Sequence, residues 1–194
     1  MRPLDIRSYK NELRAHSKAR RNLLDPLEKV QRDDAIAENV KRLYQYRTAK
    51  TILLYMSTKI EVSTEKLIEA AWQDGKSVAV PRCVPNTRNI QFYYINSFDQ
   101  LHVGAFSVRE PSEKLPVLRK FDSSLLIVPA LMVDSRGYRL GYGKGYYDRF
   151  MSNFKGQTVA LCYTNDFLQQ MYHGRFDRTV DVVVTERWIK SIKK

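Results

Sequence analysis

The spacing of apolar and polar residues changes character near residue 50. Residues 4–24 are rich in Arg, Lys, Leu and Ala and contain neither Gly nor Pro, which predicts a helix. Asp25 and Pro26 suit the cap and first turn of a second helix, whose apolar residues recur at helical spacing to about Tyr46. The first part of the chain is therefore predicted to consist of two helices.

Beyond this point, short continuous apolar runs alternate with helical patterns. Such runs are typical of strands that are buried on both faces of a sheet. They predict strands over residues 51–56, 77–80, 90–95, 125–128, 157–162 and 180–184, with Pro81 and Pro129 ending the second and fourth. Helices are predicted from Ser63 to Gly75 and from about Gly145 to Phe154, a helical turn over 166–171, and loops over 97–120.

Strands that alternate with helices favour an α/β fold with helices on both faces of the sheet. We therefore predict a three-layer α/β/α arrangement with a mostly parallel sheet of about six strands. No repeat, linker or low-complexity segment interrupts the pattern. The whole chain, residues 1–194, is expected to form a single domain, with the N-terminal helices (4–46) packing on the sheet.

Composition narrows the class of protein. Hydrophobic residues make up 43% of the chain, which excludes general disorder, and no run of about 18 apolar residues predicts a membrane span. The N-terminal residues do not resemble a secretory leader. Cys83 and Cys162 are too few for a disulfide framework and fit no zinc spacing, so we expect a reducing, cytoplasmic setting. The net charge of +12 favours anionic ligands without saying which, and a solvated basic surface is the simpler interpretation.

A glycine-rich segment carries the clearest chemical signal. Gly141, Gly143 and Gly145 alternate between a predicted buried strand and a helix, with Arg139 and Lys144 among them. Successive backbone N–H groups in such a loop can converge on an anion at the carboxyl ends of the strands. The spacing is neither that of dinucleotide-binding proteins nor that of P-loops. A plain tight connection remains the alternative.

Other polar residues have two interpretations each. Asp148 suits Mg²⁺ beside a phosphate, or it complements a helix N-terminus. Lys10 and Arg14 share one helix face, where they clamp phosphates or face solvent. Glu61 follows the first predicted strand and is either a site residue or a surface residue. Asp181 lies in an apolar run, where an unpaired charge is unusual. It is either close to a bound cation or at the start of a strand, where its side chain reaches solvent.

The segment from Arg136 to Phe150, RGYRLGYGKGYYDRF, resembles the signature of the 5-formyltetrahydrofolate cyclo-ligases, also called 5,10-methenyltetrahydrofolate synthetases. The resemblance extends over nearly the whole chain. Its further pieces are Lys10–Arg14, Tyr55–Ser57 with Glu61-Val62, Val80–Arg82, Gly104–Phe106 with Glu110-Pro111, and Thr179–Asp181 to Glu186. Arg109 and Cys83 depart from the family pattern on the folate side.

The resemblance implies an ATP- and Mg²⁺-dependent ligase of one-carbon metabolism. Such enzymes convert 5-formyltetrahydrofolate to 5,10-methenyltetrahydrofolate with release of ADP and phosphate. ATP phosphorylates the formyl oxygen, and N10 of the folate then closes the ring. This chemistry requires positioning and charge neutralisation rather than a protein nucleophile. The substrate is expected to be a folate, possibly polyglutamylated.

The family pattern also implies roles for individual residues. Catalytic roles fall on Arg139, Lys144 and Asp148, and metal binding on Asp148 and Asp181. ATP binding falls on Lys10, Arg14, Arg139, Leu140, Gly141, Tyr142, Gly143, Lys144, Gly145, Tyr146 and Tyr147. Folate binding falls on Met56, Glu61, Tyr142, Gly143, Lys144, Gly145 and Tyr146.

Two other functions are compatible with parts of the sequence. A nucleic-acid-binding module would use the +12 charge but would leave the glycine loop unexplained. A folate-binding protein without turnover, or a different ATP-dependent ligase, would keep the same fold. We expect the cyclo-ligase, with no nucleic-acid, membrane or obligate protein partner.

Overall fold

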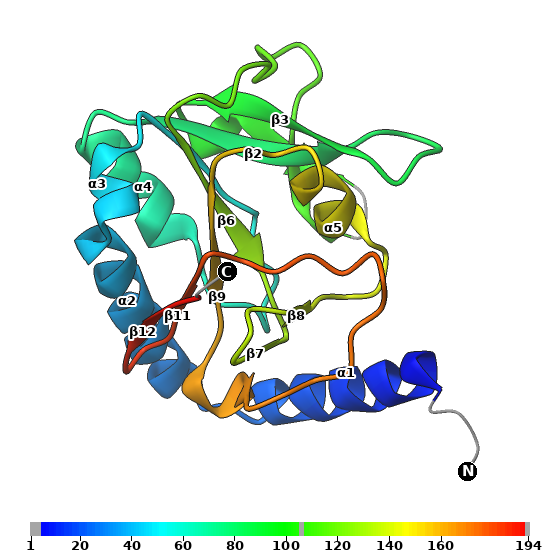
Figure 1. The fold of residues 1–194 in the computed structure, drawn as a ribbon. Helices are drawn as coiled ribbons and strands as arrows, with labels where there is room; N and C mark the ends of the chain where they lie inside the picture. The colour runs from blue at the N-terminus through cyan, green and yellow to red at the C-terminus, as the bar shows by residue number, and fades with distance from the viewer. Residues whose placement is uncertain (1–4, 105–106, 193–194) are drawn as a thin grey trace.

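The computed structural model describes residues 5–104 and 107–192. Its main sheet has seven strands in the order β12-β11-β9-β6-β1-β2-β3 (Figure 1). The parallel strands are β1 (Thr51–Leu53), β2 (Ser77–Cys83), β6 (Ser124–Pro129), β9 (Gln157–Leu161) and β11 (Val182–Val184). Antiparallel strands β3 (Ile90–Ile95) and β12 (Ile189–Ser191) form the edges. The predicted α/β fold with a mostly parallel sheet is confirmed, and β12 is the strand of this main sheet that the sequence did not predict.

Helices cover both faces of this sheet. Ile52 and Leu125 belong to a core under α2 (Pro26–Arg42), α3 (Tyr44–Thr48) and α4 (Glu65–Gln73). Their neighbours Leu53 and Leu126 belong to the opposite core, against Met151 of α5 (Tyr146–Met151). Successive side chains of one strand thus enter two different cores, as the strand period requires. This explains why both strands are continuous apolar runs.

Helix α1 (Ile6–Asn22) crosses the end of the sheet at which the parallel strands terminate (Figure 1). Asp5 caps it by accepting hydrogen bonds from the N–H groups of Arg7 and Ser8. The buried Ser17 hydroxyl donates to the carbonyl of Leu131, just beyond β6. This contact places α1 directly over the carboxyl ends of the strands.

A second, three-stranded sheet lies between the main sheet and α1. It contains β7 (Met132–Asp134), β8 (Arg139–Leu140) and β10 (Phe167–Leu168). The predicted helical turn over 166–171 is wrong, because Phe167 and Leu168 pair with β7 in parallel. The fully buried Asp134 carboxylate holds the β7–β8 turn by accepting the N–H groups of Arg136 and Tyr138. Because Arg139 begins β8, this hairpin fixes the position of Arg139.

Several predicted boundaries are corrected by the structure. The second helix breaks at Leu43, whose backbone is extended, so that α3 is a separate helix. Pro81 does not end β2, which continues to Cys83 beside β3. Proline has no backbone N–H, but β1 pairs with β2 only as far as Ala79, so no hydrogen bond to β1 is lost at Pro81. Strand β11 begins at Val182, which leaves Asp181 just outside it.

The remaining elements are short. The region predicted as loop contains η1 (Phe98–Gln100) and the hairpin of β4 (Leu101–Val103) with β5 (Arg109–Pro111). A 3-10 turn, η3 (Thr164–Asp166), precedes β10. Parts of the sequence predictions, namely Leu4 of the first helix and Ala105-Phe106 of the family resemblance, lie outside the described residues. Within the described ranges, no helix has the length and apolarity needed to cross a bilayer.

Candidate active site

A cavity of about 550 Å³, here called the main cavity, opens where β1, β2 and β6 end. Met56 reaches it from the segment after β1, Cys83 from the end of β2 and Pro129 from the end of β6. Most of the predicted site residues line it together: Lys10, Arg14, Met56, Glu61, Arg139, Leu140, Gly141, Tyr142, Gly143, Lys144, Gly145, Tyr146, Tyr147 and Asp148. The lining does not include Asp181. The sequence therefore located the cavity, while the role of each residue stays a prediction.

The glycine loop is held against α1 by Arg14. The Nε of Arg14 donates to the carbonyl of Gly141 at 2.8 Å. Gly143 has φ +92°, and a Cβ at this position would lie 3.1 Å from the Cζ of Arg14. Glycine is thus required at 143 both by the backbone conformation and by the close approach of Arg14. Gly145, with φ +76°, turns the chain into α5.

Arg139 is the most deeply buried cation of the cavity. Its side chain is 3% exposed, and its Nη2 lies 3.2 Å from Oδ1 of Asp148. Within the described residues, Nε and Nη2 of Arg139 make no hydrogen bond. Buried guanidinium donors without acceptors are costly, and an anion in the cavity would satisfy them.

Asp177 is a cavity residue that the sequence reasoning missed. It forms an ion pair with Lys10 and accepts the N–H of Gly174 at 2.9 Å. Burial lowers the pKa of Arg14, and the Asp177 carboxylate opposes this shift. Asp177 lies in an irregular segment with no motif around it, so no local signal marked it. Its carboxylate pairs with Lys10 and acts electrostatically on Arg14 at one end of the cavity.

Glu61 occupies a buried position on another side of the cavity. Its Oε2 accepts the N–H of Thr58 at 2.7 Å, within the turn that follows β1. Burial, and secondarily the negative charge of Glu61, raises the pKa of Tyr142 to about 12. The Tyr142 hydroxyl therefore keeps its proton at neutral pH and can donate a hydrogen bond.

Glu110 and Cys83 form a further part of the lining. Glu110 lies on β5, is buried, and accepts the N–H of Cys83 through Oε1 at 3.2 Å. Burial, followed by the charge of Glu110, raises the pKa of the Cys83 thiol. This cysteine is therefore a neutral cavity residue rather than an activated nucleophile. Arg109, the other departure from the family pattern, forms an ion pair with Glu65 of α4 and is not among the lining residues.

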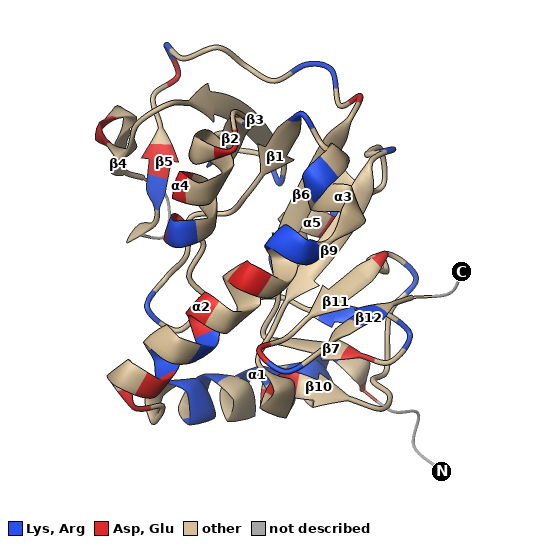
Figure 2. Cartoon of the chain, turned by 90° about the vertical axis from the view of Figure 1, so that its left-hand side faces the viewer, with Lys and Arg blue, Asp and Glu red and all other residues tan. Residues whose placement is uncertain are grey.

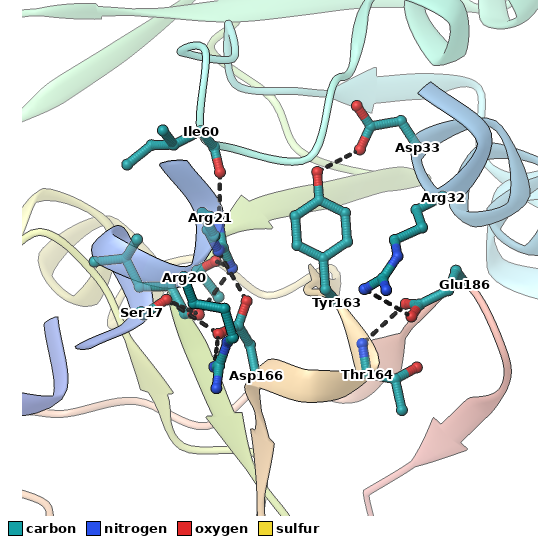
Figure 3. Close-up of polar contacts among 12 residues, drawn as sticks. Ser17, Arg20, Arg21, Arg32, Asp33, Ile60, Tyr163, Thr164, Asp166 and Glu186 are labelled. Atoms are coloured by element: carbon teal, nitrogen blue, oxygen red, sulfur yellow. Dashed lines mark hydrogen bonds and ion pairs between the residues drawn. The ribbon is translucent and has the colours of Figure 1, made fainter. Parts of the chain in front are cut away.

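A buried polar network centred on Arg21 lies next to the turn that carries Glu61 (Figure 3). Arg21 donates through Nε to Asp166 at 2.8 Å and through Nη2 to the carbonyls of Ala130 and Leu131 at 2.9 and 2.8 Å. Its Nη1 donates to the carbonyl of Ile60 at 3.1 Å, next to Glu61. One guanidinium thereby joins α1, the turn that carries Glu61 and the segment that leads to Arg139.

The metal candidates are not brought together. Asp148 lines the main cavity, where its Oδ1 also accepts the N–H of Arg178 at 3.2 Å. Asp181 instead accepts both the N–H and the hydroxyl of Thr158, at 2.8 and 2.7 Å. Across residues 5–104 and 107–192, no group of three or more His, Cys, Asp or Glu side chains is arranged to hold a metal ion. A Mg²⁺ ion in the cavity would therefore need phosphate oxygens and water among its ligands, a mode that Mg²⁺ commonly uses.

Positive charge is not confined to the cavity. Lys and Arg occur on several helices and strands with Asp and Glu among them (Figure 2). Basic and acidic residues are therefore intermixed along the described chain rather than gathered on one element.

The fold and the cavity define an α/β protein with a cavity lined by Lys and Arg at the carboxyl ends of its strands, the usual ligand position in open α/β sheets. The model of the 5-formyltetrahydrofolate cyclo-ligase family matches residues 6–186, so the chain belongs to this family of enzymes. The predicted family resemblance is confirmed.

Individual relatives agree with this membership. The chain is 27% identical over 198 residues to the 5-formyltetrahydrofolate cyclo-ligase of Mus musculus, covering 96% of this chain and 98% of the mouse protein. It is 28% identical over 174 residues to the Escherichia coli K12 enzyme of the same name, covering 86% and 94%. The NMR structure of Aquifex aeolicus 5,10-methenyltetrahydrofolate synthetase superposes with a TM-score of 0.84 at 30% identity, over 95% of this chain and 93% of that one.

Proposed function

We propose that the protein converts 5-formyltetrahydrofolate to 5,10-methenyltetrahydrofolate and consumes ATP as the phosphoryl donor, with release of ADP and phosphate. Family membership supports the folate reaction. The observation that supports a phosphorylated co-substrate is Arg139 beside the glycine-rich loop, where its buried Nε and Nη2 make no hydrogen bond within the described residues and its ion pair is with Asp148. A formyl amide oxygen leaves poorly, whereas the same oxygen leaves readily as phosphate, so phosphorylation makes ring closure possible.

Four cations of the cavity bind the phosphates, and they come from different elements of the fold. Lys10 and Arg14 approach from α1, Arg139 from β8 and Lys144 from the glycine loop. Phosphoryl transfer depends on positioning and charge neutralisation, which fixed cations and backbone N–H groups supply. Arg139 neutralises charge as it develops on the transferred group, because its guanidinium is already buried and directed by Asp148.

The folate is assigned to the side of the cavity that contains Met56 and Glu61. The buried Glu61 carboxylate accepts N–H groups of the pterin ring, and the Tyr142 hydroxyl donates to a ring acceptor. Glycine residues in the loop from Tyr142 to Tyr146 allow the formyl group to approach the phosphates closely. Negative charge on the glutamate tail is attracted by the net charge of +12.

Asp148 is the cavity carboxylate that suits a Mg²⁺ ion shared with the phosphates. Such an ion would neutralise phosphate charge during transfer. Asp181 stays a weaker metal candidate, because Thr158 already donates two hydrogen bonds to it.

The first test is the near-ultraviolet absorbance of methenyltetrahydrofolate after the protein is mixed with 5-formyltetrahydrofolate and MgATP. We expect an increase that requires the protein, ATP and Mg²⁺ together. A flat trace with folded protein would contradict the proposal. ATP hydrolysis with other acids or amides would then identify a different ligase, and folate binding without ATP consumption would identify a binding protein.

The second test removes the two cavity residues that form the buried ion pair. Arg139→Ala and Asp148→Ala should each lower kcat on the order of 100-fold, because each removes charge from the phosphoryl-transfer site. Arg149→Ala is the matched control, since Arg149 is exposed and outside the main cavity. Near-normal turnover of both cavity variants, with unchanged circular dichroism, would refute these assignments.

A further inference from the structure

The main cavity contains a second buried glutamate that the roles above leave unused. Glu110 of β5 is 6% exposed and lines the same cavity as Glu61. We propose that Glu110 is the base that takes the proton from the folate amine N10 as this nitrogen attacks the activated formyl carbon. This inference rests on the function proposed above and adds a catalytic residue to it.

The position of Glu110 is fixed by its neighbours. Arg82 of β2 donates to the carbonyl of Pro111 at 3.1 Å and to Glu113 at 2.7 Å, which ties β5 to β2. Gly104 leaves the space for the carboxylate, because a Cβ at residue 104 would overlap the Glu110 side chain. The carboxylate is thus held at the cavity wall by the chain on both sides of it.

The carboxylate nevertheless retains capacity to accept a proton. Its hydrogen bond from the N–H of Cys83 is long, at 3.2 Å, the Cys83 thiol also interacts with it, and Nη1 of Arg82 is 3.8 Å from its Oε2. A carboxylate offers about four acceptor positions, so a substrate N–H can still be accommodated. A base needs this free capacity at the moment of reaction.

Glu61 and Glu110 lie on adjacent parts of the cavity wall. Glu61 follows β1, Glu110 accepts the backbone N–H of the last residue of β2, and β1 pairs with β2. Tyr147 lines the same cavity together with Glu61, Cys83 and Glu110. In this proposal, a folate that presents its pterin N–H groups to Glu61 extends along this wall toward Glu110. The amine N10 is attached to the carbon substituent of the pterin, so it falls on that side.

Other groups of the described cavity are less suited to accept this proton. Asp148 and Asp177 are paired with Arg139 and Lys10 on the phosphate side. The Cys83 thiol carries its proton, as its raised pKa indicates. Glu61 already accepts a short hydrogen bond from Thr58 at 2.7 Å and is assigned to the pterin.

The proton transfer completes the ring closure with all atoms accounted for. The N10 lone pair forms a bond to the formyl carbon, and the N10–H proton moves to the Glu110 carboxylate. The bond between that carbon and the phosphorylated oxygen then breaks, and phosphate leaves with its electron pair. The product is the methenyl cation, and Glu110 later releases the proton to water.

The test compares Glu110→Gln with Glu110→Asp and with Glu113→Gln. Glu113 is the matched control, because it also contacts Arg82 but is mostly exposed and outside the cavity. We expect Glu110→Gln to lower kcat on the order of 100-fold, with little change in the KM for 5-formyltetrahydrofolate or in the KM for ATP. Glu110→Asp should recover part of the loss, and Glu113→Gln should retain normal turnover.

Isotope exchange separates a base from a structural residue. ATP labelled with ¹⁸O at the bridge between its β and γ phosphates scrambles the label when phosphoryl transfer to the folate reverses. Glu110→Gln should still scramble the label in the presence of folate, faster than it forms product. The inference would be overturned if Glu110→Gln lost both the scrambling and the product formation. It would also be overturned if this variant showed only a raised KM, or a normal kcat. A wild-type protein that forms no product would instead refute the proposed function itself.

Discussion

Arg20 and Arg21 offer a sharp test of the energetics of the buried network, because adjacent arginines contact the same carboxylate. The Arg21 side chain is 2% exposed and that of Asp166 is 1% exposed, whereas the Arg20 side chain is 38% exposed. Replacing Arg21 by Met removes the buried partner of Asp166. It also leaves the carbonyls of Ala130, Leu131 and Ile60 without this donor.

The expected magnitudes differ severalfold. Removing one partner of a buried ion pair costs about 3–5 kcal/mol, because the remaining charge and carbonyls are left desolvated. A half-exposed ion pair contributes less than about 1 kcal/mol, so Arg20→Met should have a small effect. Since domains are stable by only about 5–15 kcal/mol, Arg21→Met removes a large share of the total.

Equilibrium unfolding in urea, followed by circular dichroism, measures both changes. With a slope of about 2 kcal/mol per molar urea, Arg21→Met should lower the midpoint by about 2 M and Arg20→Met by less than about 0.5 M. Equal shifts for the two variants would refute the reasoning. A shift below about 0.5 M for Arg21→Met would show that the carbonyls and Asp166 find other partners.

Two further predictions concern the glycine loop. Gly143→Ala should raise the KM for ATP, because its Cβ meets Arg14, whereas Gly75→Ala should leave KM unchanged. Both glycines have positive φ, but no described residue lies within 4 Å of a Cβ at Gly75, so the two variants separate contact from backbone strain. Equal KM values for the two variants would contradict the assigned role of Arg14. Burial raises the pKa of Tyr142 from its ordinary value of 10 to about 12. The protonated hydroxyl therefore contributes fully to the free energy of unfolding below pH 10, and this contribution is lost as the pH rises toward 12. Tyr142→Phe should lack one late-titrating tyrosine in the alkaline absorbance titration and lose less stability over this range; unchanged curves would refute the shift.

The main sheet was predictable because its central strands are buried on both faces. Residues 125–128 form a continuous apolar run for this reason, and they lie within β6. β12 escaped prediction because its residues are exposed or half-buried and show no apolar pattern. Phe167 and Leu168 were assigned to a helical turn because a two-residue strand leaves no periodicity to detect.

The candidate site was predictable where residues are close in sequence. The loop from Arg139 to Asp148 combines glycines, cations and a carboxylate in one segment, and all of it reaches the cavity. Asp177 and Glu110 became cavity residues only through tertiary contacts with Lys10 and with Cys83. No spacing rule connects such partners, since packing of distant elements brings them together.

The placement of α1 has a consequence for the newly made protein. Arg21 emerges from the ribosome 145 residues before Asp166, and Lys10 emerges 167 residues before Asp177. Until residue 166 has been synthesised, the first helix has neither of these carboxylates to dock against. The cavity thus becomes complete only after Asp177 has been synthesised, and a shorter nascent chain carries the cations of the first helix without the cavity that positions them.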